Sequence, residues 1–269
     1  MPLNGFSINT SGSPRRLAQR DTEAFWRALL AVGGTDINAN NQVTVIAAAV
    51  SSIYEAVPRS SVLGLWLTAG KRNVGSGSKV IGVVGPRATL VNGLSWGEDG
   101  VSGSSSGYIN LGPSGVSGTA PQTMLAVVKW TSASTISPAA AMGTGGYLSD
   151  RLLCNHSSTS GISSYRVSGG TSVSAPAITF ANDTLHSITG TFTGSAVSQY
   201  RNGTQKQTAS GGSDILVATD LMCLGNWNAS GNGGGGGEAR IVANLSIAAS
   251  DAQVIALHAA VKLLETTLT

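Results

Sequence analysis

The chain has 269 residues, a formal net charge of +3 and only 11% charged residues, while Gly occupies 36 positions. A chain of this length can bury one large core, and its surface must be built mainly from Ser, Thr, Asn and Gly. With 41% hydrophobic residues in alternating runs and little net charge, the composition excludes an extended disordered chain and predicts many short strands joined by Gly-rich turns.

Residues 1–20 are predicted to form an N-terminal arm without the apolar stretch of a secretory signal peptide. The basic cluster of Arg15, Arg16 and Arg20 is too small for the several phosphate contacts that nucleic-acid binding requires. The most apolar later run, Val43–Val50, is too short to span a bilayer. We therefore expect no specific nucleic-acid partner and no membrane anchor.

Two helices are predicted within residues 21–61. The first begins at Asp21 as its cap and stops at Gly33, and the second ends before Pro58. Each carries an apolar stripe that is not stable alone in water, so this helical hairpin must pack on the sandwich, on its partner helix or on another chain. The residues expected to form a docking or oligomer interface are Phe25, Trp26, Leu29, Val43, Ile46, Val50, Ile53 and Tyr54.

Residues 62–269 are predicted to form a β-sandwich with a terminal helix, because the hydrophobic period changes at Val62 to that of strands. The near-continuous apolar run Thr123–Trp130 is expected at the centre of a sheet. Asn202-Gly203 predicts a type I′ hairpin turn, since both positions require a positive φ. Ser250 and Gln253 form a capping box that opens the last helix. The inward residues of this helix are Val254, Leu257, Val261 and Leu264.

The histidines and cysteines are interpreted as structural residues. Leu185–Phe192 alternates as a strand with one face against the core, which places His186 inward, and His258 lies on the apolar side of the last helix. The three histidines, with His156 in a loop, lack the spacing of a metal site. No cofactor is predicted. Calcium binding stays open, because four acids lie near loops, although they form no recognisable ligand set: Asp150, Asp183, Asp214 and Asp220. A disulfide between the two apolar-flanked cysteines also stays open; they are Cys154 and Cys223.

No catalytic pattern emerges from the sequence. A glycosidase needs two suitably spaced carboxylates, but Glu98 and Asp99 are adjacent and are expected on a turn. The segment Gly103–Gly107 fits a nucleophile elbow without the flanking strand and helix that its chemistry requires. We therefore expect a protein that is not an enzyme. Trp96 and Trp227, in Gly/Asn-rich loops, are the candidates for stacking on a sugar ring; the alternative is that each closes the edge of the sandwich.

Two resemblances follow from these segments. The order of strand LHSITGTFTG, hairpin AVSQYRNGTQKQ, strand LMCLGN, Gly-rich loop, strand EARIVANLSIAA and helix SDAQVIALHAAVKLL resembles the end of concanavalin A-like, laminin-G-type jelly rolls. The helix pair followed by LGLWLTAG and ATLVNGLSWGEDGVSGSSSGYINLG is similar to the start of tailed-bacteriophage virion proteins. The residues that carry the second similarity are Trp66, Trp96, Gly107, Tyr108 and Gly112.

The resemblance implies a structural component of a phage virion, either a surface-displayed capsid decoration or a tail-associated protein, made in the host cytoplasm. Its partners would be other virion proteins and further copies of itself, in a homo-oligomer such as a trimer. The alternatives are a carbohydrate- or receptor-binding adhesion module of a tail fibre, with a surface glycan as ligand, and a polysaccharide-degrading enzyme. We expect deletion of residues 1–57 to leave a folded sandwich that no longer enters the particle.

Overall fold

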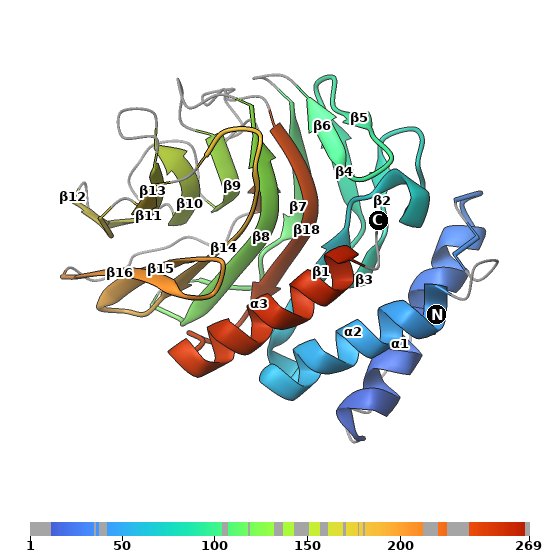
Figure 1. Ribbon diagram of the computed structural model, residues 1–269, viewed down its shortest axis with the longest axis horizontal. Helices are drawn as coiled ribbons and strands as arrows, with labels where there is room; N and C mark the ends of the chain where they lie inside the picture. The colour runs from blue at the N-terminus through green and yellow to red at the C-terminus, as the bar shows by residue number, and fades with distance from the viewer. Residues whose placement is uncertain are drawn as a thin grey trace, which may run out of the picture.

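Two antiparallel sheets lie face to face, and helices cover the outer face of one of them (Figure 1). Trp227, Asp150 and Asp214 fall outside the described residues. The computed structural model describes residues 12–34, 36–37, 42–103, 107–117, 119–131, 137–142, 151–156, 161–168, 171–176, 178–179, 181–211, 220–224 and 237–266.

The helix-covered sheet holds the longest strands. In the described part of the chain its spatial order is β16 (Gln205–Ser210), β15 (Ala196–Arg201), β14 (Leu185–Phe192), β8 (Gln122–Trp130), β18 (Gly237–Leu245), β1 (Val62–Leu67) and β3 (Gly82–Val84). Two short strands join the sheet at the first residues of β18, where β6 (Val101–Gly103) pairs with β18 and β5 (Ser95–Trp96) pairs with β6. β8 therefore lies at the middle of the sheet with later strands on both sides, as its apolar sequence predicts.

The second sheet forms the other layer of the sandwich. Its spatial order over the described residues is β12 (Thr171–Ser174), β11 (Gly161–Ser168), β10 (Arg151–His156), β9 (Ser137–Met142), β17 (Asp220–Cys223), β7 (Tyr108–Pro113), β4 (Ala88–Val91) and β2 (Lys79–Val80), with β13 (Ile178–Thr179) paired to β11. The prediction of a mostly β, antiparallel sandwich is confirmed.

The two sheets differ in how many faces they bury. Along β8, Met124 and Ala126 face the second sheet, whereas Leu125 and Val127 face the helices, and all four are buried. Along β7, by contrast, buried Ile109 alternates with half-buried residues. A strand buried on both faces reads as a continuous apolar run, whereas one buried on a single face alternates. The sequence patterns thus follow from the position of the helical layer.

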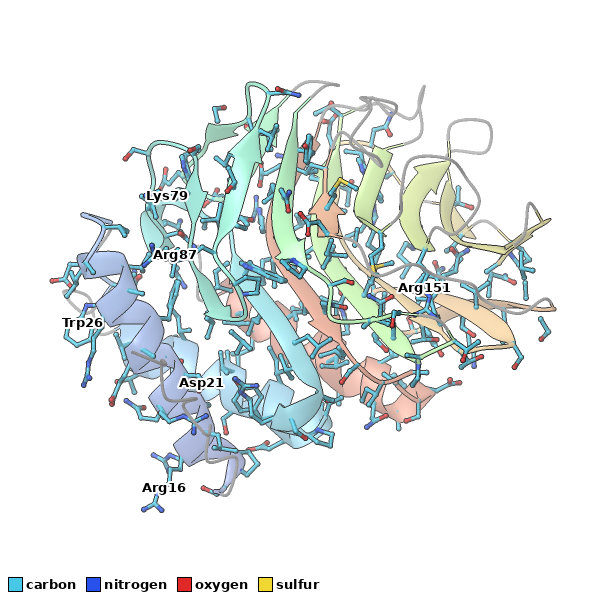
Figure 2. The ribbon with its side chains drawn as sticks, turned by 180° about the vertical axis from the view of Figure 1, so that it is seen from behind. Arg16, Asp21, Trp26, Lys79, Arg87 and Arg151 are labelled. Carbon is cyan, nitrogen blue, oxygen red and sulfur yellow. The ribbon has the colours of Figure 1, made fainter. Side chains whose placement is uncertain are left out.

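The helices are α1 (Pro14–Leu30), α2 (Gln42–Ala56) and α3 (Asp251–Thr266), with short 3₁₀ turns η1 (Arg59–Ser61) and η2 (Gly70–Arg72). α1 begins earlier than predicted. Ser13 caps it by accepting a hydrogen bond from the Arg16 N–H at 3.4 Å, and Pro14 fits the first helical position, where no N–H partner is needed. The arm predicted over residues 1–20 is therefore helical from Pro14, and Arg16 projects outward from this helix (Figure 2).

The helix residues predicted to contact another chain are instead packed within this one. Phe25, Ile46 and Ile53 are at most 1% exposed and belong to a core shared with the helix-covered sheet. Leu29, Val43, Val50 and Tyr54 are buried in the same cluster, and half-buried Trp26 packs against it. This corrects the assignment to an intermolecular interface: the apolar stripes are satisfied by the partner helix and the sandwich. The outward sides still expose Val45, Ile255 and Leu263.

The C-terminal elements follow local sequence signals closely. Asn202 and Gly203 adopt φ of 53° and 77° and close the β15–β16 hairpin, as predicted. The capping box is also present, with the Ser250 N–H donating to Gln253 Oε1 at 3.0 Å and the Gln253 N–H donating to Ser250 Oγ at 3.3 Å. The four predicted inward residues of α3 are buried. Together these signals bring the helix across β14 and the hairpin.

One strand differs from its prediction in a way that matters for the site. β14 is buried on both faces, although its alternation predicted one. Ile188 and Phe192 face the second sheet, whereas the opposite face, which carries Leu185 and Ser187, lies beneath α3. Small polar side chains on that second face are therefore enclosed by the helix.

Cys223 is buried and is not part of a disulfide, and burial raises the pKa of its thiol to about 12. The Cys154 side chain lies outside the described part of the structure. Over the same described ranges, no helix is both long and apolar enough to cross a membrane. Nor do three or more His, Cys, Asp or Glu side chains gather there in a way that would hold a metal ion.

Candidate functional site

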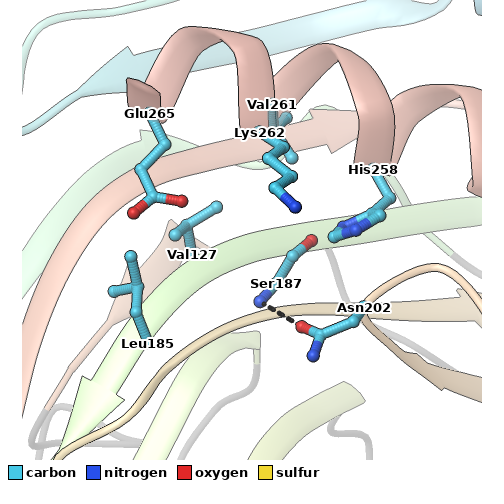
Figure 3. Close-up of a pocket in the computed structure, with 8 residues that line it drawn as sticks. All are labelled: Val127, Leu185, Ser187, Asn202, His258, Val261, Lys262 and Glu265. Atoms are coloured by element: carbon cyan, nitrogen blue, oxygen red, sulfur yellow. Dashed lines mark hydrogen bonds between the residues drawn. The ribbon is translucent and has the colours of Figure 1, made fainter. Parts of the chain in front are cut away.

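A pocket lies between α3 and the helix-covered sheet (Figure 3). Four of its residues project from one face of α3, because positions separated by three, four and seven residues share a helix face. The rest come from β14, from its partner β8 and from the hairpin turn. The complete lining is Val127, Leu185, Ser187, Asn202, His258, Val261, Lys262 and Glu265.

The hairpin turn fixes the width of this pocket. A Cβ on Gly203 would lie only 2.8 Å from the Cβ of His258, so the turn can approach α3 this closely only with glycine at this position. Asn202 is tied to β14 by two hydrogen bonds: the Ser187 N–H donates to Asn202 Oδ1 at 3.1 Å, and the Asn202 N–H donates to the Ser187 carbonyl at 2.7 Å. The turn, the strand and the helix therefore form one rigid frame.

Two buried polar atoms in the pocket have no hydrogen-bond partner within the described structure: Ser187 Oγ and His258 Nδ1. Ser187 is 8% exposed and lies in the wall of the pocket. A buried hydroxyl without a partner costs about 1–3 kcal/mol, and most buried polar groups in native proteins are hydrogen-bonded. Burial, followed by the nearby Lys262 ammonium, lowers the pKa of His258, which favours the neutral imidazole.

The charged groups stand at the rim of the pocket. Figure 3 shows Lys262 and His258 on one side and Glu265 on the other. Glu265 lies 3.5 Å from Arg240 Nη1, and burial raises the pKa of its carboxyl above the ordinary value against the opposing effect of the Arg240 and Lys262 cations. The floor is apolar, formed by Val127 and Leu185. The pocket thus offers an apolar base with polar and charged groups around it.

The size of the pocket limits what it holds. Its volume is about 190 Å³. Drug-sized ligands occupy roughly 300–1,000 Å³, whereas a cavity of about 150 Å³ accepts a single benzene ring. A single small ring with polar substituents therefore matches this pocket, and an extended ligand would place only one unit inside it.

The sequence-predicted sugar site lies elsewhere in the sandwich. Trp96 is half-buried at the end of β5, where its indole N–H donates to the Gly77 carbonyl at 2.9 Å and its ring packs against the inter-sheet core. Its contacts are those of a side chain that closes the sandwich edge. Trp227 lies outside the described residues, in a segment that leaves β17 opposite Ile109 and enters β18 opposite Gly103.

The adjacent acids Glu98 and Asp99 form part of an ion-pair group at the β5–β6 turn. Lys71 Nζ lies 2.8 Å from Asp99 Oδ1 and 3.7 Å from Glu98 Oε1, which joins the turn to η2. The hydrogen bond from Lys71 holds the pKa of Asp99 below its usual range. Of the acids considered for calcium, Asp220 accepts a hydrogen bond from Asn110 Nδ2 at 3.0 Å.

The predicted core histidines have different surroundings. His186 is buried on β14 and contacts the Ala181 carbonyl at 3.2 Å, and burial lowers its pKa. His258 is half-buried and lines the pocket. The side chain of His156 lies outside the described residues. The interpretation of His258 as a packed core residue is therefore corrected, because its ring borders a cavity.

No protein-family model and no curated protein sequence matches the chain. Solved structures do. Domain 4 of AbnA, a GH43 extracellular arabinanase from Geobacillus stearothermophilus in complex with arabinotriose, is 14% identical with a TM-score of 0.56 over 73% of this chain and 98% of that one. The likeness is one of fold.

Two further structures show the same fold in longer proteins. A sialidase from Trypanosoma rangeli is 12% identical with a TM-score of 0.54, over 81% of this chain and 38% of the sialidase. The receptor-binding domain of botulinum neurotoxin mosaic serotype C/D is 13% identical with a TM-score of 0.55, over 74% of this chain and 50% of that one. This chain therefore spans well under half of the sialidase and half of the toxin domain.

The prediction that the chain is not an enzyme is corrected by these comparisons. Structures with the same fold include a sialidase and a domain of an arabinanase. The prediction drew only on missing sequence patterns, although the residues of a catalytic site can come from distant segments of a chain and are recognised by their geometry.

The pocket residues escaped sequence analysis because they lie far apart along the chain. Ser187 and Asn202 carried structural roles, as a strand position and a turn position, that fully explained them. Lys262 and Glu265 show no local pattern that distinguishes them from other charged residues of a helix. One signal was available. Ser187 is polar but shares a strand face with apolar Leu185, and the capped, amphipathic last helix needs such a face to pack against.

Proposed function

We propose that this chain is a glycan-binding β-sandwich module of the concanavalin A-like, laminin-G type, carried on a bacteriophage particle. The observation that carries the proposal is the pair of buried, unpartnered polar atoms, Ser187 Oγ and His258 Nδ1, at the wall of a pocket sized for one ring. A sugar ring supplies hydroxyls that both donate and accept, together with an apolar face for the floor of Val127 and Leu185.

Two further points support this proposal. The similar structures include a domain in complex with arabinotriose and a toxin domain named for receptor binding. Assignment to a phage particle rests on the sequence resemblance to tailed-phage virion proteins. It is tested by locating the protein in purified particles with labelled antibody, where particles that lack the protein would contradict it.

Ser187→Ala is expected to weaken glycan binding while it stabilises the protein. The variant removes a hydroxyl that has no partner in the described structure, so the free energy of unfolding should rise by ~1 kcal/mol, which corresponds to ~2–4 °C in melting temperature. The same hydroxyl is proposed to bind the sugar, so affinity should fall roughly tenfold. Glycan-array screening followed by titration calorimetry and thermal denaturation measures both effects.

Ser198→Ala is the matched control. Ser198 lies on β15 in the same sheet, and its hydroxyl is 2.8 Å from Thr208 Oγ1, away from the pocket. We expect unchanged glycan binding and a slightly lower melting temperature. An unchanged dissociation constant in Ser187→Ala, for a glycan bound by the wild type, would contradict the assignment of binding to this pocket.

A further inference from the structure

We infer that the sugar bound beneath α3 is an acidic one, such as a hexuronic acid, and that Lys262 binds its carboxylate. This inference rests on the proposed glycan-binding function and names the class of its ligand. It follows from the balance of charges and hydrogen-bonding groups around the pocket, element by element.

The neighbouring cations are already engaged by carboxylates. Arg240 Nε lies 2.6 Å from Glu238, Lys129 Nζ lies 3.0 Å from the same carboxylate, and Lys206 Nζ lies 2.7 Å from Asp251. Lys262 differs from these cations: across the described residues, no carboxylate lies within 4.0 Å of its ammonium group. The pocket therefore has at its rim a cation that forms no direct ion pair with the protein, although Glu265, one turn further along α3, lies within electrostatic range of it.

The strongest hydrogen-bond donor beside the pocket is Lys262. Its ammonium group offers three donors and no acceptor, whereas the Ser187 hydroxyl and the neutral His258 ring can each accept as well as donate. The acceptor Asn202 Oδ1 is occupied by the Ser187 N–H, and the Glu265 carboxylate is shared with Arg240. A ligand that brings acceptors with negative charge beside Lys262 satisfies Lys262 and Ser187 together. A carboxylate does so with two oxygens.

Glu265 gives the ligand a direction. It lies about one turn further along α3 than Lys262, at the far end of the pocket from His258 (Figure 3), and it would repel a second negative charge while accepting hydrogen bonds from hydroxyls. The ligand therefore carries one anionic end at Lys262 and hydroxyls at Glu265. A ring of the size set by 190 Å³, with a single carboxylate and several hydroxyls, is an acidic monosaccharide unit.

The test compares each acid with its uncharged methyl ester. Glucuronic acid, galacturonic acid and N-acetylneuraminic acid, as methyl glycosides, are titrated into wild type, Lys262→Gln and Lys262→Arg by calorimetry. In wild type, at least one acid should bind roughly tenfold more tightly than its ester. Lys262→Gln should remove that preference, and Lys262→Arg should keep it because the positive charge stays. Lys206→Gln, which changes an exposed lysine already paired with Asp251, is the control and should keep the preference.

The outcomes separate this inference from the proposed function. If an ester binds as tightly as its acid, and Ser187→Ala still weakens binding roughly tenfold, the pocket binds sugars but the acidic class is wrong. A preference that persists in Lys262→Gln overturns the role of Lys262. If no sugar, charged or neutral, binds the wild type, the proposed function fails together with this inference.

Discussion

A chain that begins at Pro58 is expected to be insoluble or unfolded. Its loss would remove α1 and α2, whose buried side chains share one core with the helix-covered sheet. Phe25, Leu29, Ile46, Val50 and Ile53 are each at most 1% exposed. At about 1.5–3 kcal/mol for each buried side chain, these five contribute roughly 8–15 kcal/mol, which is comparable to the whole stability of an ordinary domain.

This expectation replaces the one from sequence, that deletion of residues 1–57 leaves a folded sandwich. The deletion would expose Leu65, Leu67 and Leu245 on a sheet that needs cover on both faces. Expression of residues 58–269, followed by centrifugation and circular dichroism, measures the outcome. A chain of residues 12–269, which keeps all of α1, is the control and should be soluble. A soluble, cooperatively folded 58–269 fragment would contradict the shared core.

Asp21→Ala is expected to lower the free energy of unfolding by ~3–5 kcal/mol. Asp21 sits inside α1, facing α2 (Figure 2), and is 8% exposed. Its Oδ2 accepts hydrogen bonds from the Tyr54 hydroxyl at 2.7 Å and from Arg59 Nε. Burial and the Asp21 carboxylate raise the pKa of Tyr54, which keeps its hydroxyl protonated as a donor. Without Asp21 the Arg59 cation, whose side chain is 15% exposed, would be left without this partner.

Glu23→Ala on the same helix is the matched control. Glu23 is more exposed, with a Gln19 amide donor at 2.9 Å, and exposed pairs contribute only ~0.2–1 kcal/mol. Urea denaturation of both variants gives the comparison. Asp21 of α1, Tyr54 of α2 and Arg59 form one buried group, and Arg59 also donates a hydrogen bond to the Val62 carbonyl at the start of β1. A loss in unfolding free energy below ~1 kcal/mol for Asp21→Ala would contradict the view that this group joins α1 to α2 and to β1.

Features set by neighbouring residues were predictable from the sequence. The Asn202-Gly203 turn and the capping box of Ser250 and Gln253 depend on local backbone geometry, and both are present as predicted. The central position of β8 also followed, since only a strand buried on both faces tolerates so continuous an apolar run. Such signals are complete within a few residues of sequence.

Features set by packing were not predictable in the same way. The start of α1 was placed at Asp21 because an acidic residue before an apolar stripe reads as a cap, whereas the side chain is buried against α2. Most strands between 137 and 179 were missed, because segments such as Ser137–Met142 and Thr171–Ser174 are rich in Ser and Ala and show neither clear alternation nor a continuous apolar run; only the apolar context of Cys154 indicated a strand there. The pocket was missed for the same reason at a longer range: Ser187 and Lys262 are brought together only when α3 crosses β14.

The most direct test of the pocket as the glycan site is a crystal structure with an acidic monosaccharide bound. We expect its ring between α3 and β14, with a hydroxyl or carboxylate oxygen within hydrogen-bond distance of Ser187 Oγ and the carboxylate at Lys262. A sugar found instead beside Trp96 at the β5–β6 end, or on the outer face of the second sheet, with none beneath α3, would contradict it.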